Sequence, residues 1–471
     1  MLIVAATLAL APTPAAAREV FGVHGDRLGA PYPPAFEDWG DPVLLTGGVA
    51  YLDLPGKHAH AMFRPAGGPS RTLGQFEPLL TRTRKRDLIA NLELAGDGRR
   101  LALGRWDEHP DGFPEGFGAV VAATLDGPAR TLADCPKGVF WGPQIDGRVL
   151  AFLNFVRPGC KGDLRELAYD LATGAVFDIP SVEDNGSDPL IAGRYAIWSD
   201  QVFEHGQDIP RSLVYDFRSQ RRVHVTRRWD LLAIDGDATL VAAVFTVPGK
   251  PIDYECRDLV TYTLAHTAAR KLPYQTCKPY RTLLQGHRIV FMSAPPGRSP
   301  SGQRQRLMLG DTSGGPAIPL TESIGGGLTP FDFDGERIAY ELHSCTVARL
   351  LAVDDVATAR ARGPIHIRPC RATLDPPSNA VDLERGFDLG IDCPRGCSGK
   401  LWVKSGSRRW RLRGPHLSPL APGMHTVHVN APSAKAASGN ETQTATLQFA
   451  VLQQDGSTRT YKKPIEIERP G

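Results

Sequence analysis

Acidic and histidine side chains gather in two stretches of the chain that are expected to be loops. One stretch contains Asp107 and His109, and the other contains Asp200 and His205. A carboxylate and an imidazole held together can act as general acid and base, and paired carboxylates can cleave glycosidic bonds. One hypothesis is therefore an enzyme, a lyase or hydrolase that acts on an extracellular glycan. Tyr254, in a third expected loop, is a further candidate for contact with a ligand.

Metal binding is less well supported by these residues. The clustered carboxylates of residues 107–115 could bind Ca²⁺, but they lack the D-x-D-x-D-G spacing, so a solvated acidic loop is favoured. His58 and His60 would face the same side of an expected strand. No third ligand is identifiable, and surface or packing histidines are the favoured interpretation. We predict no metal and no cofactor.

The motifs of common enzyme classes are missing from the sequence. It contains no G-x-S-x-G nucleophile elbow, no P-loop, no dinucleotide-binding fingerprint and no H-E-x-x-H pair. Binding is therefore favoured over catalysis, and no catalytic residue is assigned.

A basic cluster lies near the C-terminus. It consists of Lys404, Arg409, Arg411 and Arg413. On a strand the three arginines would share one face, with Trp410 and Leu412 pointing inward. Residues 367–471 hold 15 Lys and Arg against 9 Asp and Glu, whereas the rest of the chain holds 39 against 42. The cluster could bind a polyanion such as a wall polymer, but a solvated strand face is favoured, and nucleic acid is not expected.

A repeat of about 49 residues must position the acidic and histidine candidates. In each copy an apolar run, a turn with glycine and a second apolar run follow one another, as hairpins require. The turn glycines are at positions 48, 98, 147, 193, 236, 286 and 335, so they are spaced 50, 49, 46, 43, 50 and 49 residues apart. Two further strand-like runs follow in each copy, for example 212–217 and 222–226. Four strands per repeat predict an all-β chain with a seven-bladed β-propeller over residues 18–368. A linear β-solenoid is the alternative.

The repeat resembles that of TolB-type propellers, in which an Asp-Gly turn precedes a strand such as Arg337-Ile338-Ala339-Tyr340. The resemblance covers residues 40–368. It departs from the family because Ser-Pro never precedes the turn, and because three copies lack the Asp. WD-repeat, kelch and sialidase signatures are not visible. The resemblance implies the fold of a bacterial propeller, which can serve as a protein-binding scaffold, as a sensor or occasionally as an enzyme domain.

The eight cysteines fit this blade pattern. Three sets of two cysteines fall in connections on one face, either between the second and third strands or after a fourth strand. We predict the disulfides Cys135–Cys160, Cys256–Cys277 and Cys345–Cys370, and Cys393 and Cys397 would staple a turn. A zinc site is disfavoured because a second close pair is missing. The same face would carry the longest loops, which are 106–118, 201–211, 246–257 and 294–304.

Export is expected from the N-terminus. Residues 2–11 form an apolar run, and Ala15-Ala16-Ala17 offers a cleavage site, so residues 1–17 are predicted to be a signal peptide. The run lacks a preceding basic residue, so the true start could lie upstream. No later apolar run is long enough to span a membrane. We expect a secreted or envelope-exterior protein.

The periodicity is lost after Cys370. Alternating runs occupy 383–391, 400–404, 409–413, 424–430, 442–452 and 459–468. They predict a β-sandwich of immunoglobulin or fibronectin type over residues 369–471. The phrase Pro-Gly-Met-His-Thr-Val-His-Val at 422–429 resembles the strand entry of bacterial immunoglobulin-like domains.

Three hypotheses follow. The preferred one is a monomeric binding or scaffold protein that uses the long-loop face to bind a protein or an envelope polymer. The second is the glycan-active enzyme. The third is a structural module of the envelope in which the basic sandwich tethers the propeller.

Overall fold

The computed structural model describes nineteen parts of the chain. These are residues 18–23, 42–54, 59–81, 89–108, 114–135, 140–154, 165–179, 190–204, 207–244, 256–276, 282–293, 304–321, 324–325, 331–346, 349–366, 368–414, 420–431, 441–453 and 458–468. The predicted signal peptide lies outside them. No helix in these parts is long and apolar enough to cross a membrane.

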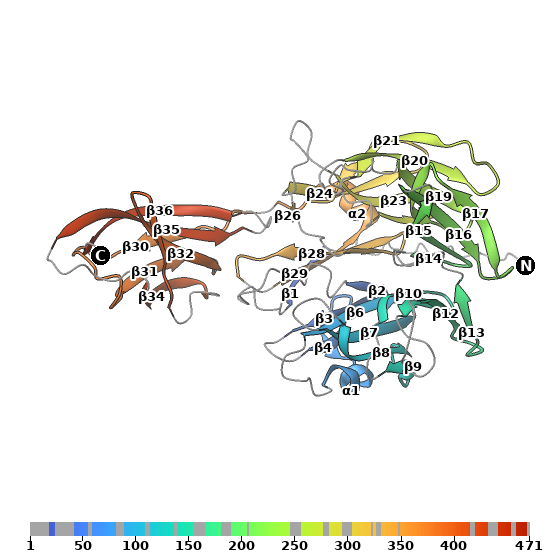
Figure 1. Ribbon diagram of the computed structural model, residues 1–471, viewed down its shortest axis with the longest axis horizontal. Coiled ribbons are helices and arrows are strands. Elements are labelled where there is room, and N and C mark those ends of the chain that lie inside the picture. Colours follow the sequence, from blue (N-terminus) through green and yellow to red (C-terminus); the bar gives the residue numbers. More distant parts are fainter. Residues whose placement is uncertain are drawn as a thin grey trace, which may run out of the picture.

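Successive antiparallel sheets occupy the described residues from 19 to 355, and all but the last are formed by strands that follow one another in the chain (Figure 1). Sheet 1 contains β2 (Val43–Leu45), β3 (Gly48–Asp53), β4 (His60–Pro65) and β5 (Arg71–Thr72). Sheet 2 contains β6 (Ile89–Gly96), β7 (Arg100–Glu108), β8 (Pro114–Thr124) and β9 (Arg130–Cys135). Sheet 3 contains β10 (Phe140–Asp146), β11 (Val149–Asn154), β12 (Arg165–Asp170) and β13 (Val176–Ile179). Sheet 4 contains β14 (Leu190–Ala192), β15 (Tyr195–Glu204), β16 (Gln207–Asp216) and β17 (Arg221–Thr226). Sheet 5 contains β18 (Trp229–Ile234), β19 (Thr239–Val244), β20 (Arg257–Thr263) and β21 (Arg270–Thr276).

Sheet 6 contains β22 (Thr282–Gln285), β23 (Arg288–Ser293), β24 (Arg304–Asp311) and β25 (Ile318–Pro319), and β26 (Ile324–Gly325) also pairs with β24. Sheet 7 contains β27 (Phe331–Phe333), β28 (Arg337–His343), β29 (Arg349–Asp355) and the N-terminal strand β1 (Glu19–Val23). The arrangement is that of a β-propeller, and the predicted all-β class is confirmed.

The turns between the first two strands follow the predicted glycines, with two exceptions. Most of these glycines have the positive φ that a tight hairpin requires, for example 86° at Gly98 and 94° at Gly335. In the first sheet the residue with positive φ is Gly47 and not the predicted Gly48. In the fifth sheet it is Ala238, at 69°, and not Gly236. The spacing in the sequence therefore located each turn to within two residues.

Contacts between neighbouring turns join the sheets into a closed ring. The hydrogen bonds run from Thr46 N–H to the Gly98 carbonyl (2.6 Å), from Arg100 to the Gly147 carbonyl, from Gly193 N–H to Asp146, from Gly286 N–H to Asp235, from Arg288 to the Gly335 carbonyl (2.5 Å) and from Arg337 to the Leu45 carbonyl (2.9 Å). Between sheets 4 and 5, a Cβ added at Gly193 would lie 3.6 Å from the Cα of Gly236. The contact of Arg337 with Leu45 connects the last sheet to the first.

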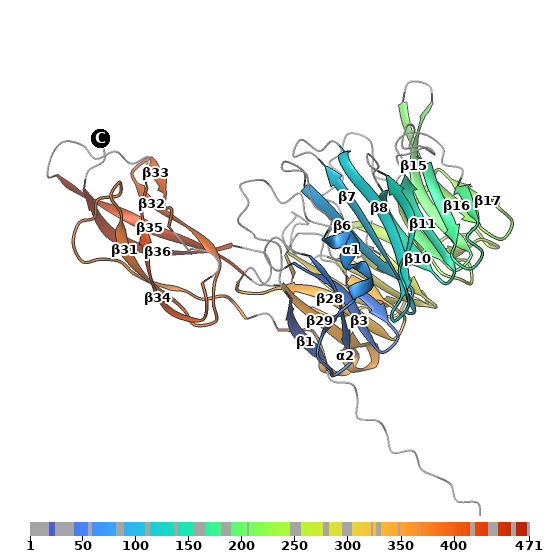
Figure 2. The ribbon, with the colours of Figure 1, turned by 90° about the horizontal axis from the view of Figure 1, so that it is seen from below.

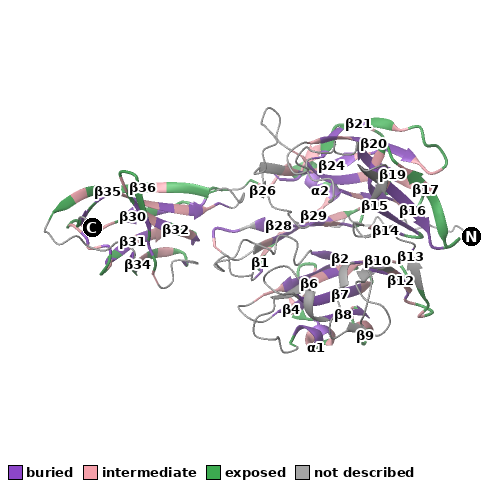
Figure 3. Ribbon diagram, viewed as in Figure 1, coloured by how far each residue is buried: buried purple, intermediate pink, exposed green. Residues whose placement is uncertain are grey.

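Buried apolar clusters lie between neighbouring sheets (Figure 3). In ring order they include Leu52 with Leu103, Val120 with Phe152, Ala168 with Trp198, Ile197 with Leu240, Leu259 with Phe291, Val290 with Tyr340, and Tyr51 with Ala339. Each sheet thus covers an apolar face of the next, which is how a propeller buries sheets that could not be stable alone.

The N-terminal strand closes the ring (Figure 2). Strand β1 pairs with β29, with Glu19 opposite Val353 and Val23 opposite Arg349. Just before it, Arg18 donates from Nε to both carboxylate oxygens of Asp354, at 2.7 and 2.9 Å. Asp354 is fully buried, and the Tyr340 hydroxyl also donates to it at 2.6 Å. The last sheet therefore takes its outer strand from the beginning of the chain.

This closure corrects one step of the cysteine prediction. Cys370 was expected to follow the fourth strand of the seventh repeat, but β1 is that strand, and the chain after β29 forms helix α2 (Val356–Arg362) instead. The Asp355 side chain caps this helix by accepting from Thr358 N–H, and Gly363 ends it with a positive φ of 71°. Two further short helices, η1 (Gly74–Phe76) and α1 (Glu77–Leu80), also lie where the sequence predicted no helix.

The C-terminal residues form two antiparallel sheets over a shared apolar core. One contains β30 (Thr373–Asp375), β31 (Phe387–Cys393) and β34 (Gly423–Val429), and the other contains β33 (Arg408–Arg411), β32 (Gly399–Ser405), β35 (Thr442–Leu452) and β36 (Thr458–Glu468). Leu389, Val403 and Phe449 are among the fully buried residues of this core. Five of the six predicted strands agree closely, and the first lies a few residues later than expected.

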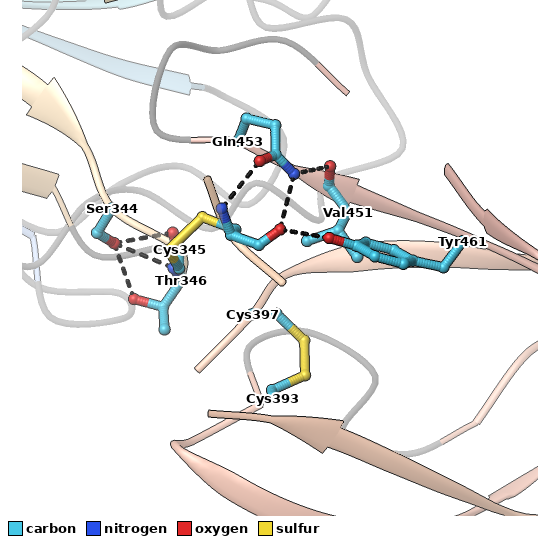
Figure 4. Close-up of a disulfide and its surroundings, with 9 residues drawn as sticks. Ser344, Cys345, Thr346, Cys393, Cys397, Val451, Gln453 and Tyr461 are labelled. Atoms are coloured by element: carbon cyan, nitrogen blue, oxygen red, sulfur yellow. Dashed lines mark hydrogen bonds between the residues drawn. A yellow bond between two sulfur atoms is a disulfide. The ribbon is translucent and has the colours of Figure 1, made fainter. Parts of the chain in front are cut away.

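A disulfide connects these sheets to the propeller (Figure 4). The predicted Cys345–Cys370 bond is present, with a Cα–Cα distance of 5.4 Å. Gln453 accepts from Cys370 N–H at 2.9 Å, and the Tyr461 hydroxyl donates to the Cys370 carbonyl at 2.7 Å. The predicted Cys393–Cys397 bond is also present. Cys256 is disulfide-bonded, but Cys277 and Cys160, the predicted partners of Cys256 and Cys135, lie outside the described residues.

Candidate functional site

The two ends of the propeller strands differ in construction. At one end, which we call the turn face, lie the turns between the first and second strands and between the third and fourth. At the other end, which we call the loop face, lie the connections between the second and third strands and those from one sheet to the next. The side chains Asp146 and Arg337 on the turn face join neighbouring sheets. Each predicted long loop connects the second strand of a sheet to the third, so the strands that flank it meet it at the loop face; residues 246–255 and 294–303 lie outside the described residues.

Two of these predicted loops are partly strand. Residues 201–211 were expected to be a loop, but β15 and β16 stay paired as far as Glu204 and Gln207 and form a hairpin that extends beyond the neighbouring strands (Figure 2). Likewise, β7 and β8 pair as far as Glu108 and Pro114, inside the predicted loop 106–118. Strand pairing holds the bases of these connections in place, which favours their use in binding.

The predicted ligand residues are only partly placed. Asp200 lies in β15, opposite Arg211 of β16, and its side chain is not among the described ones. His109, His205 and Tyr254 lie outside the described residues. The expected convergence of these side chains therefore stays a prediction.

Asp107 has a structural partner. Its carboxylate lies 3.2 Å from Nε and Nη2 of Arg105, and both residues are almost fully buried in β7. Arg105 also donates from Nη1 to the Leu79 carbonyl of α1 at 2.6 Å. Residues two apart on a strand share a face, so this pair forms within one strand. The Asp107 carboxylate is therefore engaged by Arg105, while the other residues of the enzyme hypothesis, His109, Asp200 and His205, have no described side chains.

A second buried ion pair was not expected from the sequence. Nη1 of Arg257, at the start of β20, lies 3.0 Å from the carboxylate of Asp230, near the start of β18, and both residues are buried. Buried charges are rare unless they are paired. Strands β18 and β20 begin at the loop face, and β7 ends at the same face. Both buried ion pairs, one in sheet 2 and one in sheet 5, therefore lie beneath the loop face. A charged residue within an apolar strand was the signal that could have found them.

The turn face gathers carboxylates around the ring. Burial raises the pKa of Asp146, the N–H of Gly193 opposes this shift, and the negative charges of Asp97 and Asp235 raise the pKa further. Burial likewise raises the pKa of Asp235. Asp146 and Asp235 are engaged in contacts between sheets, so these turn-face groups hold neighbouring sheets of the ring together.

The basic cluster of the C-terminal domain has the predicted alternation. Lys404, Arg409, Arg411 and Arg413 are exposed. Trp410 and Leu412 are buried in the shared core. Lys404, Arg409 and Arg411 therefore share the outer face of the β33–β32–β35–β36 sheet, whereas Arg413 lies beyond β33 and pairs with Asn430, next to β34 of the other sheet.

The histidine pair considered as a metal site is also partly placed. His60 lies in β4, with Nδ1 3.1 Å from Oε1 of Glu77, whereas His58 is outside the described residues. Within the described parts of the chain, no group of three or more His, Cys, Asp or Glu residues is arranged to hold a metal ion.

No protein-family model matches this chain, and no curated protein matches it in sequence. Among solved structures, it is similar to the β-propeller domain of the Trilobed protease from Pyrococcus furiosus, with 11% identity and a TM-score of 0.44 over 64% of this chain and 90% of that one. It is also similar to a prolyl endopeptidase (15% identity, TM-score 0.47, 76% and 53% of the two chains) and to TolB from Acinetobacter baumannii (14%, 0.35, 67% and 79%). The chain spans only about half of the prolyl endopeptidase. These similarities concern the propeller fold alone.

Proposed function

We propose that this chain is an exported, monomeric binding protein. Residues 1–17 direct export, residues 18–368 form a seven-bladed β-propeller, and residues 369–471 form an immunoglobulin-like sandwich. The loop face of the propeller binds a protein or an envelope ligand, and Asp200, His109, His205 and Tyr254 belong to the contact surface.

The difference between the two faces of the propeller carries this proposal. Turn-face groups such as Arg100 and Asp146 are used in contacts between sheets. The loop face has the extended β15–β16 hairpin, and beneath it lie the buried pairs Arg105–Asp107 and Arg257–Asp230. Recognition elements on a rigid support lose little conformational entropy on binding, which favours affinity.

Shortening the hairpin tests the proposal. Residues 202–209 are replaced by Asn-Gly, which joins Gln201 to Pro210, a pair already opposite each other in the sheet. The full-length protein is photo-crosslinked in envelope extract of its source cells, and captured partners are quantified by mass spectrometry. We expect the shortened protein to lose its main partner by about tenfold or more, as loss of a central contact region does.

A matched control shortens a connection on the turn face. Residues 265–268, between β20 and β21, are replaced by Asn-Gly, and this variant should capture the partner as the wild type does. Equal capture by the hairpin variant would show that the hairpin is not the recognition element. Release of sugars from an envelope glycan by the wild type would instead show that the protein is an enzyme.

A further inference from the structure

We propose that the outer face of the β33–β32–β35–β36 sheet binds an acidic polysaccharide and so tethers the propeller to a polymer. This site is separate from the loop face and does not depend on what the propeller binds. We call it the basic face. It consists of Lys400, Trp402, Lys404, Arg409, Arg411, Gln448 and Lys462.

Strand register places these side chains on one surface. Arg411 lies opposite Trp402, Trp402 opposite Gln448, and Gln448 opposite Lys462, so one line of side chains crosses all four strands. In the next line, Arg409 lies opposite Lys404. Neighbouring strands are about 4.8 Å apart, so a line across four strands extends over roughly 14 Å. A linear polymer that crosses the sheet could therefore meet a cation at both ends of its path.

One arginine is held in position by an aromatic ring. The guanidinium carbon of Arg409 lies 4.2 Å from the ring centroid of Trp402, on the neighbouring strand. Stacking orients the flat guanidinium and leaves its N–H edges available for bidentate bonds to a carboxylate or sulfate. The Arg409 side chain has thus already lost much of its conformational entropy before an anion binds, unlike an arginine that extends freely into solvent.

Acidic side chains do not neutralise the basic face. Within the described residues, none of Lys400, Lys404, Arg409, Arg411 and Lys462 forms an ion pair. The carboxylates on the same side of the sheet, Glu466 and Glu468, lie on β36 opposite Thr444 and Thr442, beyond the last β35 residue that pairs with β32. Positive charge on a connected surface attracts polyanions and weakens with added salt.

The remaining side chains favour a sugar polymer over a protein or a membrane. The large apolar side chains that are exposed in the described residues are Val20, Val176, Val223, Val225 and Met424. None of them lies on this sheet, and Trp402, the aromatic residue of the basic face, is half-buried and lies under Arg409, so the face offers no fully exposed apolar anchor to a protein or a membrane. Gln448 on the basic face, and Thr460 beside Lys462 on the same side of β36, instead offer amide and hydroxyl groups that can bond to sugar hydroxyls.

The test measures binding of the purified full-length protein to immobilised polygalacturonate, with neutral dextran as the blank, at several salt concentrations. The variant Lys404→Gln/Arg409→Gln/Arg411→Gln should bind about tenfold more weakly or worse, because it loses charge-assisted bonds. The single variant Arg409→Lys keeps the charge but not the planar fork, and it should be weakened severalfold. Circular dichroism confirms that each variant is folded.

A control removes the same charge elsewhere. Arg218, Arg221 and Arg228 are exposed on the propeller, and Arg228 stacks on Trp229 at 4.7 Å. Their triple Gln variant should bind polygalacturonate as the wild type does. Equal weakening by both triple variants would overturn the proposal, because net charge alone would then explain binding. Wild-type affinity of Arg409→Lys, or binding only to phosphatidylcholine–phosphatidylglycerol vesicles, would also overturn it.

Discussion

At the scale of single residues, Asp146 shows how the ring balances charge against burial. Its carboxylate accepts the Gly193 N–H and so joins two sheets, yet burial raises its pKa and two further carboxylates add to the shift. A raised pKa means that the folded state holds the proton more tightly than the unfolded state does. The stabilisation from this proton is complete below the unfolded pKa and is lost as the pH rises through the folded pKa.

We expect Asp146→Asn to stabilise the propeller at neutral pH, since asparagine keeps an acceptor for Gly193 without the partly buried charge. The melting temperature should rise by roughly 1–3 °C at pH 7, and the gain should shrink as the pH falls towards 4. Thermal unfolding followed between pH 4 and 8 measures this. Asp126→Asn, at an exposed carboxylate paired with Arg71, serves as the control and should show no gain. A lower melting temperature for Asp146→Asn at pH 7 would contradict the prediction.

At the scale of elements, strand β1 is held to the ring by an ion pair between Arg18, just before the strand, and a buried carboxylate. Arg18 bonds to the fully buried Asp354 and also to the Gly363 carbonyl at 3.1 Å. Removing Arg18 leaves a buried carboxylate without its charge partner, which typically costs about 3–5 kcal/mol. Arg64, which pairs with Glu19 of the same strand, is more exposed, so its pair should contribute much less.

Arg18→Ala should therefore loosen β1 more than Arg64→Ala does. Hydrogen exchange of peptides that cover residues 19–23 and 349–355 measures the effect at both strands. Exchange should be faster in both peptides for Arg18→Ala and close to that of the wild type for Arg64→Ala. Asp354→Asn combined with Arg18→Gln should restore part of the protection, because it removes both charges. Equal protection in the wild type and in Arg18→Ala would show that β1 is held by backbone pairing alone.

Local patterns in the sequence predicted the elements better than their closure. The turn at Gly335 and the strand 337–340 could be found because the signal lies within a few residues. The pair Arg18–Asp354 could not, since its members are 336 residues apart. The projecting end of the β15–β16 hairpin has the sequence pattern of a loop, because few apolar residues mark it. The acidic run after Asp107 is typical of a solvated loop, and only the strand pairing shows that Asp107 shares a strand face with Arg105, two residues earlier.

At the scale of the whole molecule, the junction between the propeller and the C-terminal domain is tied at several points. The connecting segment is held by a bond from Ile365 N–H to the Leu320 carbonyl of the propeller (3.0 Å). Cys370 bonds to Cys345 on one side and to Gln453 and Tyr461 on the other. A loop-face ligand and a polymer on the basic face would therefore be held in a fixed arrangement, and not joined by a flexible linker.

We expect the double variant Cys345→Ser/Cys370→Ser to free this junction while both domains stay folded. Loss of the disulfide removes a constraint that typically contributes about 2–4 kcal/mol, so residues 363–372 should become sensitive to protease and small-angle scattering should show a wider spread of shapes. Cys393→Ser/Cys397→Ser is the matched control, because that bond lies within the C-terminal domain and should leave the scattering profile unchanged. If the junction variant scatters as the wild type does, the contacts of Gln453 and Ile365 are sufficient to fix the two domains, and the disulfide adds stability without setting their arrangement.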